Sequence, residues 1–333
     1  MEIQSVSLKE YSSLRVGGEG LLVVVHTEDE LEDAVTYARE HSKQIHILGG
    51  GTNSYFGEEL SSFLFIKPEF FGVDWKESEG VVFLTAGSSE LWDDIVSQTT
   101  VRGLWGIENL SLIPGTIGAA PVQNIGAYGV ELMNTFVSLR AYDTLTKTYV
   151  DLDRDACQFG YRMSVFKREP QRYVVLSVTL VLSSEARPVL SYKPLDVLQN
   201  TVSCSAEEVR QAVIDVRRAK LPDWKEYANA GSFFKNPVIT KIEGEGLKEK
   251  YEGISLHEVD GGYKISAAWL IEHVAQMKGV KMGDVRTWEK QPLVLVNDGE
   301  ATADDIDSFA SRLKNAIFEK TGIRLEQEVE RVG

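Results

Sequence analysis

Cysteine, long hydrophobic runs and targeting signals are scarce in this sequence of 333 residues. The two cysteines, Cys157 and Cys204, are isolated and lack the spacing of a metal site. The aliphatic run near the N-terminus, residues 21–25, is far shorter than the roughly 20 apolar residues that cross a bilayer. The first residues also lack the basic and apolar regions of a signal peptide. We therefore expect a protein of a reducing, cytoplasmic compartment.

Positive charge is scarce as well. The chain has 35 Lys and Arg residues against 50 Asp and Glu, a formal net charge of −15. Nucleic-acid binding requires a basic surface that neutralises phosphates, so no nucleic-acid partner is expected. An anionic ligand would have to be held locally, by backbone amides or by a few Arg and Lys side chains. Hydrophobic residues make up 43% of the chain, enough at this length for a sizeable core and two domains.

Strand and helix patterns alternate along the sequence, which indicates an α+β or α/β architecture. Helices are predicted after two capping boxes, at residues 27–30 and 205–208. Further helices, each followed by a glycine, are predicted at 267–278 and 302–320. Apolar and alternating runs predict strands at residues 21–26, 45–48, 63–66, 81–86, 174–182, 293–296 and 323–329.

The first candidate binding loop is glycine-rich and spans residues 49–54, after a predicted strand. Its consecutive glycines allow amide N–H groups to converge on an anion. The loop is neither a Walker A loop nor a G-x-G-x-x-G fingerprint, because the Lys-Ser/Thr pair and the glycine spacing are absent. The loop contains no His or Cys, and this absence speaks against covalent attachment of a cofactor there, although His46 lies close before it. An ordinary glycine turn is the alternative.

The second candidate loop, residues 109–129, is dense in Gly, Pro, Ala, Asn and Gln. No Lys or Arg occurs between Arg102 and Arg140. Small residues permit close backbone approach, and amides with short polar side chains supply hydrogen bonds. A purely structural loop is possible, but two such loops in one chain fit a large, flat cofactor that carries a pyrophosphate.

Three polar residues stand out as candidates for chemistry. Arg162 follows an aromatic turn, where a solvated surface group is the ordinary interpretation. Ser232 lies on a Gly turn before two Phe residues, without the G-x-S-x-G elbow of a hydrolase, so a proton donor suits it better. Lys235 and Lys220 are cations near it in sequence that suit a proton donor or an oxyanion site, and a polar turn serine is the alternative. Glu328 lies on the charged face of the last predicted strand, expected to be solvated unless that face borders a cleft.

In combination, these motifs resemble the UDP-N-acetylenolpyruvoylglucosamine reductase family over nearly the whole chain. The segment around Tyr192 resembles the longer type of this family, which has a substrate-covering tyrosine loop. Two positions depart from the pattern: Gln327 stands where many relatives have Pro, and Glu330 where a basic residue is common. Residues 240–262 match nothing in the pattern and are expected to be variable surface. The resemblance is carried by residues 48–54, 113–129, 159–162, 220–223, 229–237 and 325–329.

The resemblance implies an α+β fold. It consists of an FAD-binding domain of the vanillyl-alcohol-oxidase (PCMH) type in two lobes and a smaller α+β substrate-binding domain. The expected boundaries are 1–67 and 68–219 for the two lobes, 220–322 for the substrate-binding domain, and 323–333 for a C-terminal strand that carries Glu328.

The resemblance also implies the reaction and its ligands. FAD is bound non-covalently, NADPH donates hydride, and UDP-N-acetylglucosamine enolpyruvate accepts it at C3 and is protonated at C2, which gives UDP-N-acetylmuramate for peptidoglycan. Ser232 would protonate C2, while Arg162 and Glu328 would stabilise the enolate. No metal is implied. FAD would be held by Leu48, Gly49, Gly50, Gly51, Thr52, Asn53, Ser54, Ile113, Pro114, Gly115, Thr116, Gly118, Ala119, Gln123, Asn124, Gly126, Ala127, Tyr128 and Gly129. The nucleotide-sugar would be held by Tyr161, Tyr192, Arg217, Lys220, Asn236 and Gln291.

Two other functions fit parts of the sequence. An oxidase of the same fold would use dioxygen and another alcohol or sugar, and a regulatory module would bind flavin or nucleotide-sugar without consuming NADPH. In an oxidase, the serine segment and Glu328 would be coincidental. The expected partner is a small nucleotide-sugar, with no membrane association, and we expect a monomer.

Overall fold

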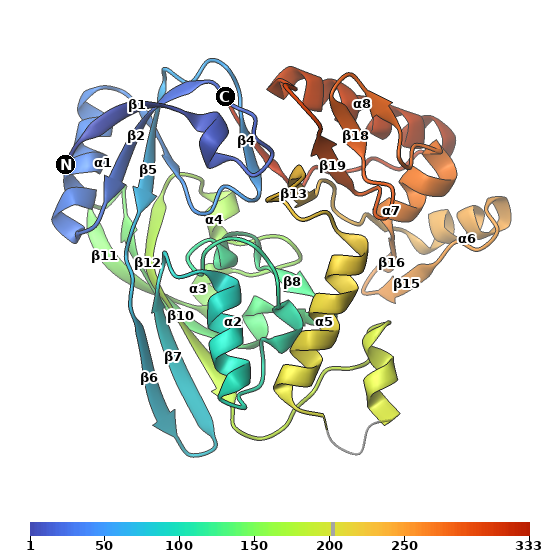
Figure 1. Ribbon diagram of the computed structural model, residues 1–333, viewed down its shortest axis with the longest axis horizontal. Coiled ribbons are helices and arrows are strands. Elements are labelled where there is room, and N and C mark those ends of the chain that lie inside the picture. Colours follow the sequence, from blue (N-terminus) through green and yellow to red (C-terminus); the bar gives the residue numbers. More distant parts are fainter. Residues whose placement is uncertain (201–203) are drawn as a thin grey trace. The chain divides into compact units, whose positions relative to one another are not determined.

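The computed structural model describes residues 1–200 and 204–333, which form two compact units (Figure 1). Each unit is discontinuous in sequence. No helix in the described part of the chain is long and apolar enough to cross a membrane. Unit 1 comprises residues 1–6, 20–50 and 61–218, and unit 2 comprises residues 7–19, 51–60 and 219–333.

The first sheet of unit 1 has the strand order β1-β2-β5-β3, and its β2–β5 and β3–β5 pairs are parallel. Helix α1 (Glu28–Glu40) packs its apolar face into the core of this sheet. The Thr27 hydroxyl accepts a hydrogen bond from the Glu30 N–H at 3.2 Å, which confirms the predicted N-cap. The Glu30 carboxylate accepts from the His26 N–H, one residue earlier than a capping box requires. The strands are β1 (Ile3–Ser7), β2 (Glu19–Val25), β3 (Gln44–Ile47) and β5 (Phe63–Pro68).

The second sheet of unit 1 is antiparallel, with the order β11-β10-β12-β7-β6. Its central strand β12 alternates buried and half-buried residues, so both of its faces are largely covered. Helices α2 (Trp92–Val101), α3 (Arg154–Cys157) and α4 (Val165–Arg168) lie near the sheet, and α5 (Ala206–Lys220) is the last helix of the unit (Figure 1). The strands are β6 (Val73–Ser78), β7 (Val81–Gly87), β10 (Phe136–Asp143), β11 (Thr148–Asp153) and β12 (Tyr173–Ser183).

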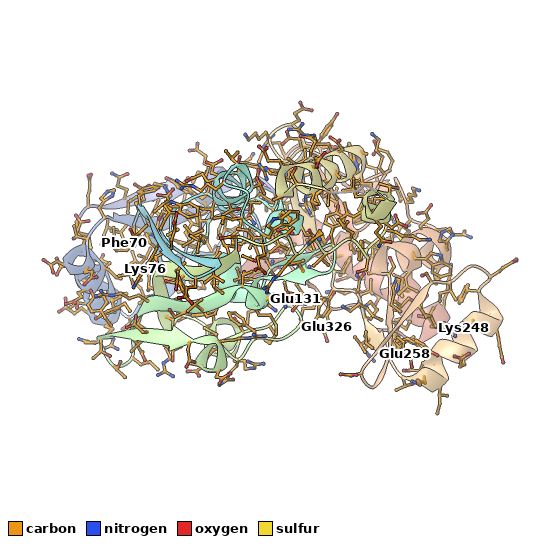
Figure 2. The ribbon with its side chains drawn as sticks, turned by 90° about the horizontal axis from the view of Figure 1, so that it is seen from below. Phe70, Lys76, Glu131, Lys248, Glu258 and Glu326 are labelled. Atoms are coloured by element: carbon orange, nitrogen blue, oxygen red, sulfur yellow. The ribbon has the colours of Figure 1, made fainter. Side chains whose placement is uncertain are left out.

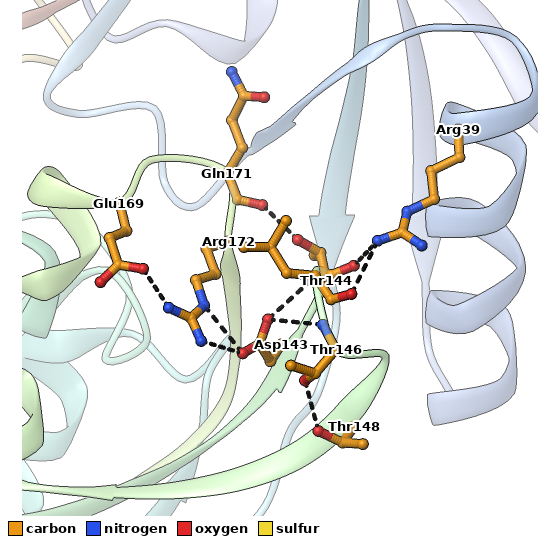
Figure 3. Close-up of polar contacts among 9 residues, drawn as sticks. Arg39, Asp143, Thr144, Thr146, Thr148, Glu169, Gln171 and Arg172 are labelled. Carbon is orange, nitrogen blue, oxygen red and sulfur yellow. Dashed lines mark hydrogen bonds and ion pairs between the residues drawn. The ribbon is translucent and has the colours of Figure 1, made fainter.

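Asp143 organises the turn between β10 and β11 (Figure 3). Its buried carboxylate accepts from Arg172 Nε and Nη2 at 3.0 and 2.8 Å and from the Leu145 N–H at 2.9 Å. Arg172 also pairs with Glu169, and Arg39 of α1 donates to the Thr144 carbonyl. These bonds join the turn to the start of β12 and to α1.

Unit 2 contains a four-stranded antiparallel sheet, order β13-β19-β18-β17, covered by α8 (Ala303–Thr321). The predicted start and end of α8 are confirmed: Thr302 and Asp305 form a capping box, and Gly322 closes the helix at φ 74°. A smaller sheet of β14 (Val238–Ile239), β16 (Gly262–Ile265) and β15 (Leu256–Val259) lies with α6 (Lys241–Lys250). This part carries charged side chains such as Lys248 and Glu258 (Figure 2). The larger sheet comprises β13 (Ala228–Ser232), β17 (Lys281–Met282), β18 (Val285–Thr287) and β19 (Val294–Asn297).

Two segments do not have the secondary structure predicted for them. The helix expected at 267–278 is a short α7 (Ala267–Trp269) that widens into a π-helix (Leu270–Ala275) and ends at Gln276, whose φ is 58°. The strand expected at 323–329 is irregular, and strand β20 (Glu330–Val332) begins only afterwards. β20 pairs in parallel with β4 (Ser54–Phe56), a contact between distant segments that no local pattern indicates.

Candidate active site

The two glycine-rich loops meet within unit 1. A Cβ added to Gly50 would lie 2.9 Å from the Cα of Gly115, and one added to Gly49 would lie 3.2 Å from the Cβ of Ala119. Leu48, just before this turn, is buried and donates its N–H to the Ile66 carbonyl at 2.8 Å. The contact at Gly50 is so close that only a residue without a side chain fits there unless the backbone moves.

The second loop is held by backbone hydrogen bonds at one edge of α2. The Trp92 N–H donates to the Gly115 carbonyl at 3.0 Å, and the Gly118 N–H donates to the Ser88 carbonyl at 2.9 Å. A Cβ on Gly118 would lie 2.5 Å from the Cβ of Ser88. Within the described residues, the buried Ser88 hydroxyl has no hydrogen-bond partner. Glycine-rich loops beside an unpaired hydroxyl suit a pyrophosphate, so the residues present fit FAD.

The second half of the first loop belongs to unit 2. Gly51 has φ 61°, and a Cβ there would lie 1.8 Å from the Tyr11 carbonyl oxygen, so this position requires glycine. Asn53 Nδ2 donates to the Glu328 carbonyl at 3.2 Å, and the Asn53 carbonyl accepts from the Glu330 N–H at 2.9 Å. Thr52 and Ser54 flank this contact. The loop therefore also anchors the C-terminal segment.

Asn124 supports the second loop from inside. It is fully buried and adopts φ 45°. Its amide nitrogen donates to Glu131 at 2.8 Å and to the Gly160 carbonyl at 3.2 Å, and its oxygen accepts from the Met133 N–H at 3.0 Å. The neighbouring Gln123 accepts from Lys167 at 3.3 Å. These bonds leave the Asn124 side chain little capacity for a ligand, so it shapes the loop.

Arg162 lies against the hairpin of β8 (Gly126–Ala127) and β9 (Val130–Glu131). Its Nη2 donates to the Gly126 carbonyl at 2.7 Å, and its backbone is left-handed, with φ 53°. A Cβ on Gly126 would lie 3.1 Å from Arg162 Nη1. The guanidinium carbon also lies 5.5 Å from the centre of the Tyr161 ring. Arg162 is thus fixed by the candidate cofactor loop and is not a freely solvated arginine.

Tyr128 connects this loop to the other predicted substrate residues of unit 1. Its ring meets the ring of Tyr192 edge to face at 5.6 Å, and its hydroxyl accepts a hydrogen bond from Arg217 of α5. Tyr192 is 52% exposed, so the tyrosine loop offers its ring to solvent. Burial raises the pKa of Tyr128, which keeps the hydroxyl protonated.

Arg217 is a cation that lacks a full set of protein partners. Burial lowers its pKa, and the nearby Tyr128 and Asp93 oppose this shift. Its Nε is buried without a hydrogen-bond partner among the described residues. Lys220, three residues further on, is exposed at the end of the same helix. A half-buried guanidinium beside an exposed ammonium suits an anionic ligand.

In unit 2, a bulge in β13 presents Ser232. The buried Asn229 accepts from the Gly231 N–H at 3.0 Å and donates to the Tyr227 carbonyl at 2.7 Å, which bends the strand. Gly231 has φ 70°, and the register against β19 shifts between Asn229 and Ser232. The Ser232 side chain is exposed. Asn229 was not among the predicted site residues, although Asn two residues before Gly is a turn signal that could have identified it.

Glu328 lies beside the residue that follows Ser232. Its N–H donates to the Phe233 carbonyl at 2.8 Å, and the Lys235 N–H donates to the Glu326 carbonyl at 2.9 Å. Glu328 is 9% exposed, so the expected solvated face is wrong at this position. Alternation fails because residues 323–329 do not form a regular strand, and Glu328 and Val329 are both buried.

The departure at Gln327 has a structural explanation. Gln327 and Phe234 are opposite each other in an isolated antiparallel β-bridge. The two backbone hydrogen bonds on either side of this pair are donated by the N–H groups of Lys235 and Glu328. The N–H of Gln327 does not serve this ladder, so a proline would lose neither bond. In this chain, the Gln327 side chain instead donates to the Tyr55 hydroxyl at 3.0 Å and to the Val329 carbonyl at 2.9 Å.

The remaining predicted substrate residues also have structural contacts. Asn236 accepts from the Ala267 N–H at 2.9 Å through its amide oxygen, which leaves its amide nitrogen for a ligand. The Gln291 carbonyl accepts from the N–H of Val294, the strand partner of Ser232. Within unit 2, Ser232, Glu328 and Gln291 therefore lie around one end of β13, and unit 1 collects Arg162, Tyr161, Tyr128, Tyr192 and Arg217.

Metal and thiol chemistry find no support in the described part of the chain. No group of three or more His, Cys, Asp and Glu residues there could hold a metal ion. Burial raises the pKa of Cys157 to about 12, so its thiol stays protonated and inert at neutral pH.

Comparison with known proteins identifies the family. Residues 223–332 match the model for the UDP-N-acetylenolpyruvoylglucosamine reductase C-terminal domain. The chain is 39% identical over 313 residues to the UDP-N-acetylenolpyruvoylglucosamine reductase of Idiomarina loihiensis, covering 94% of this chain and 91% of that protein. The chain belongs to the UDP-N-acetylenolpyruvoylglucosamine reductase family. The Pseudomonas aeruginosa member of this family is 37% identical and covers 98% of each chain.

The expected fold of this reductase family member is confirmed. Residues 20–148 match an FAD binding domain. The crystal structure of UDP-N-acetylenolpyruvylglucosamine reductase from Thermus caldophilus superposes over all of both chains with a TM-score of 0.71 at 23% identity. The predicted α+β fold with an FAD-binding domain, and the predicted flavin-dependent oxidoreductase class, are therefore correct.

Proposed function

We propose that this chain reduces UDP-N-acetylglucosamine enolpyruvate to UDP-N-acetylmuramate, with NADPH as hydride donor and non-covalent FAD. The observation that carries the proposal is that unit 2 holds the buried Glu328 against the strand that presents Ser232. Relatives of matching length carry the name of this reductase, and they do not favour the alternative of an oxidase.

The two glycine-rich loops and their flanking residues would hold FAD. The close packing at Gly49, Gly50 and Gly118 excludes side chains from these loops, and backbone N–H groups of glycine-rich loops can bind phosphate oxygens. When bound, FAD supplies hydride transfer from NADPH to C3 of the enolpyruvyl group. The chain itself must then bind the substrate, stabilise the charge that develops on it and provide a proton at C2.

Arg162 and Glu328 are proposed to stabilise the enolate. Hydride addition beside a carboxylate increases negative charge on its oxygens, and donors already in position lower that barrier. Arg162 is held in place by its bond to Gly126, so it does not need to reorganise during the reaction. Glu328 would act as a protonated or hydrogen-bonding partner of the same carboxylate.

Ser232 is proposed to protonate C2. A serine hydroxyl is a weak acid in water, so it requires a cationic neighbour such as Lys220 to donate readily. The bulge at Gly231 projects the hydroxyl from the strand while Asn229 fixes the backbone below it. The exposed side chain can therefore reach a substrate without moving the sheet.

The nucleotide-sugar is proposed to be held by cationic, aromatic and amide side chains of the candidate site. Arg217 and Lys220 would bind the diphosphate, Tyr161 and Tyr192 would contact the sugar and uridine, and Asn236 and Gln291 would donate amide hydrogen bonds. The placement of cations at the end of α5 explains how a chain of net charge −15 can bind an anion.

We also propose the functional division of the chain and its setting. Residues 1–67 and 68–219 would form the two lobes of the FAD-binding domain, 220–322 the substrate-binding domain, and 323–333 the strand that carries Glu328. The protein would act as a cytoplasmic monomer, which size-exclusion chromatography with light scattering on the FAD-loaded chain would test.

The test of the proposed function separates the two half-reactions. Visible absorbance is recorded anaerobically, first with NADPH and then with UDP-N-acetylglucosamine enolpyruvate. Wild type should bleach with NADPH and recover its colour with the second compound. Ser232→Ala should bleach normally but recover far more slowly, whereas the exposed Ser255→Ala should behave as wild type. Near-normal recovery in Ser232→Ala would remove Ser232 from the mechanism, and a protein that never binds FAD would end the flavin assignment.

A further inference from the structure

A chain of side-chain hydrogen bonds adjoins the segment that carries Glu328. Gln327 Nε2 donates to the Tyr55 hydroxyl at 3.0 Å, and that hydroxyl donates to the carboxylate of Asp307 on α8. Asp307 also pairs with Arg331 of β20. Tyr55 is fully buried in β4, and burial raises the pKa of its hydroxyl. The hydroxyl therefore stays protonated and can donate its hydrogen bond to Asp307.

These bonds matter because the backbone around Glu328 is irregular. Residues 323–329 form no regular strand, and an isolated bridge between Phe234 and Gln327 joins them to the chain after Ser232. The Glu328 N–H and carbonyl are bonded to Phe233 and Asn53, so the residue before Glu328 is the next point at which the direction of its side chain can be fixed. Gln327 precedes Glu328 directly, so a fixed Gln327 side chain restricts the backbone at Glu328.

We propose that the Tyr55 hydroxyl is a positioning group for Glu328. It fixes the Gln327 side chain against β4 and α8, and so fixes the direction of the neighbouring Glu328 carboxyl without contacting substrate or FAD. The inference rests on the proposed role of Glu328 and extends it to residues that the family resemblance did not identify. Asp307 supports the same role by accepting a hydrogen bond from the Tyr55 hydroxyl.

The test compares the two half-reactions in full-length, FAD-loaded Tyr55→Phe. Flavin reduction by NADPH should stay within about twofold of wild type. Reoxidation by UDP-N-acetylglucosamine enolpyruvate should slow about five- to tenfold, the effect expected when one hydrogen bond that orients a reacting group is lost. Tyr263→Phe is the matched control, because it removes a tyrosine bond to Glu245 in the same unit, and it should slow neither step.

A double-mutant cycle adds a readout that general destabilisation would not reproduce. Gln327→Ala should slow reoxidation at least as much as Tyr55→Phe, because it also removes the bond to the Val329 carbonyl. The double variant should be no slower than Gln327→Ala, because the bond between the two side chains is already lost there. If Tyr55→Phe does not fold, Gln327→Ala alone carries the test, since Gln327 is only half-buried.

Distinct outcomes separate this inference from the proposed function. Glu328→Gln should slow reoxidation strongly. If it does so while Tyr55→Phe leaves reoxidation unchanged, or slows both half-reactions equally, the positioning role is overturned and the role of Glu328 stands. Additive effects in the double variant would also overturn it. If Glu328→Gln reacts as wild type, the proposed function of Glu328 itself fails.

Discussion

Arg210 binds both carboxylate oxygens of Asp93, with Nη1 to Oδ1 at 2.6 Å and Nη2 to Oδ2 at 3.0 Å. Asp93 lies in the first turn of α2 and also accepts from the N–H of Leu112, at the start of the second glycine-rich loop. The pair therefore joins α5 to that loop. Burial alone would raise the pKa of Asp93, but the bonds from Arg210 and Leu112 hold it below its ordinary value.

Arg210→Lys should weaken both stability and substrate binding. Lysine cannot form the bidentate pair, so the free energy of unfolding should fall by about 1–2 kcal/mol, as expected for a largely buried charged hydrogen bond. Arg217 lies seven residues further along α5 on the same face, so the KM for the nucleotide-sugar should rise several-fold while kcat changes little. Denaturant unfolding and steady-state kinetics measure these effects. The exposed pair of Arg187 and Glu185 gives the control, Arg187→Lys, and equal behaviour of the two variants would contradict the prediction.

Gly50→Ala should weaken FAD binding. The new methyl group would lie 2.9 Å from the Cα of Gly115, so one of the two loops must move. We expect the dissociation constant for FAD to rise about tenfold or more, since such overpacking typically costs 1–3 kcal/mol. Titration of the apoprotein with FAD, followed by flavin fluorescence, measures it.

The control for Gly50→Ala is Gly246→Ala in α6. Gly246 has helical geometry, and an added Cβ would meet no atom within 4 Å. Alanine there should stabilise the protein by about 0.5–1 kcal/mol through helix propensity and leave FAD binding unchanged. Undiminished FAD affinity in Gly50→Ala would show that the loops do not need this close contact.

The sequence predicted those structural elements that depend on interactions between residues close together in the chain. The starts of α5 and α8 follow from reciprocal bonds between a capping residue and an acidic residue three positions later, and these bonds are present at Ser205 and Thr302. The two glycine-rich loops could be identified because closely packed backbone requires glycine and other small residues, which are visible in the sequence. Their mutual contact could be expected only from a shared ligand.

What the sequence could not predict depends on contacts between distant segments. The parallel pairing of β4 with β20 assigns residues 51–60 to unit 2, and no periodicity encodes it. The burial of Glu328 follows from that pairing and from the irregular backbone before it, whereas the alternating sequence alone favoured a solvated face. Likewise, the bidentate contact of Arg210 with Asp93 joins two helices whose sequences each look ordinary.

Asn229→Ala should lower both stability and the rate of the second half-reaction. The substitution leaves the Gly231 N–H and the Tyr227 carbonyl without their partner in a partly buried turn, which typically costs about 1–2 kcal/mol. The bulge that presents Ser232 would relax, so flavin reoxidation by the enolpyruvyl substrate should slow while reduction by NADPH is retained. Denaturant unfolding and stopped-flow absorbance measure the two effects.

The control for Asn229→Ala is Asn134→Ala. Asn134 is exposed and accepts one backbone bond from the Glu131 N–H at 2.7 Å in a surface turn. Its loss should cost about 1 kcal/mol or less and change neither half-reaction. If Asn229→Ala loses stability but reoxidises at the wild-type rate, the bulge is a structural feature without a part in presenting Ser232.

His46 should make the stability of the fold depend on pH. The imidazole lies on β3 with its ring 5.4 Å from that of Phe65, and burial lowers its pKa from 6.5 to about 4. Below about pH 6.5, the unfolded chain binds a proton that the folded chain does not, so stability is lost as the pH falls toward about 4. Between about pH 7.5 and 5.5, this group alone should cost about 1 kcal/mol.

His46→Gln should remove that part of the pH dependence, because glutamine does not titrate. Denaturant unfolding of the FAD-loaded protein at both pH values gives the difference directly. The exposed His257→Gln removes another histidine and leaves His46 in place, so it should keep the wild-type slope. An unchanged slope in His46→Gln would mean that the imidazole binds a proton as readily in the folded chain as in the unfolded one, and that β3 beside the FAD loop admits water.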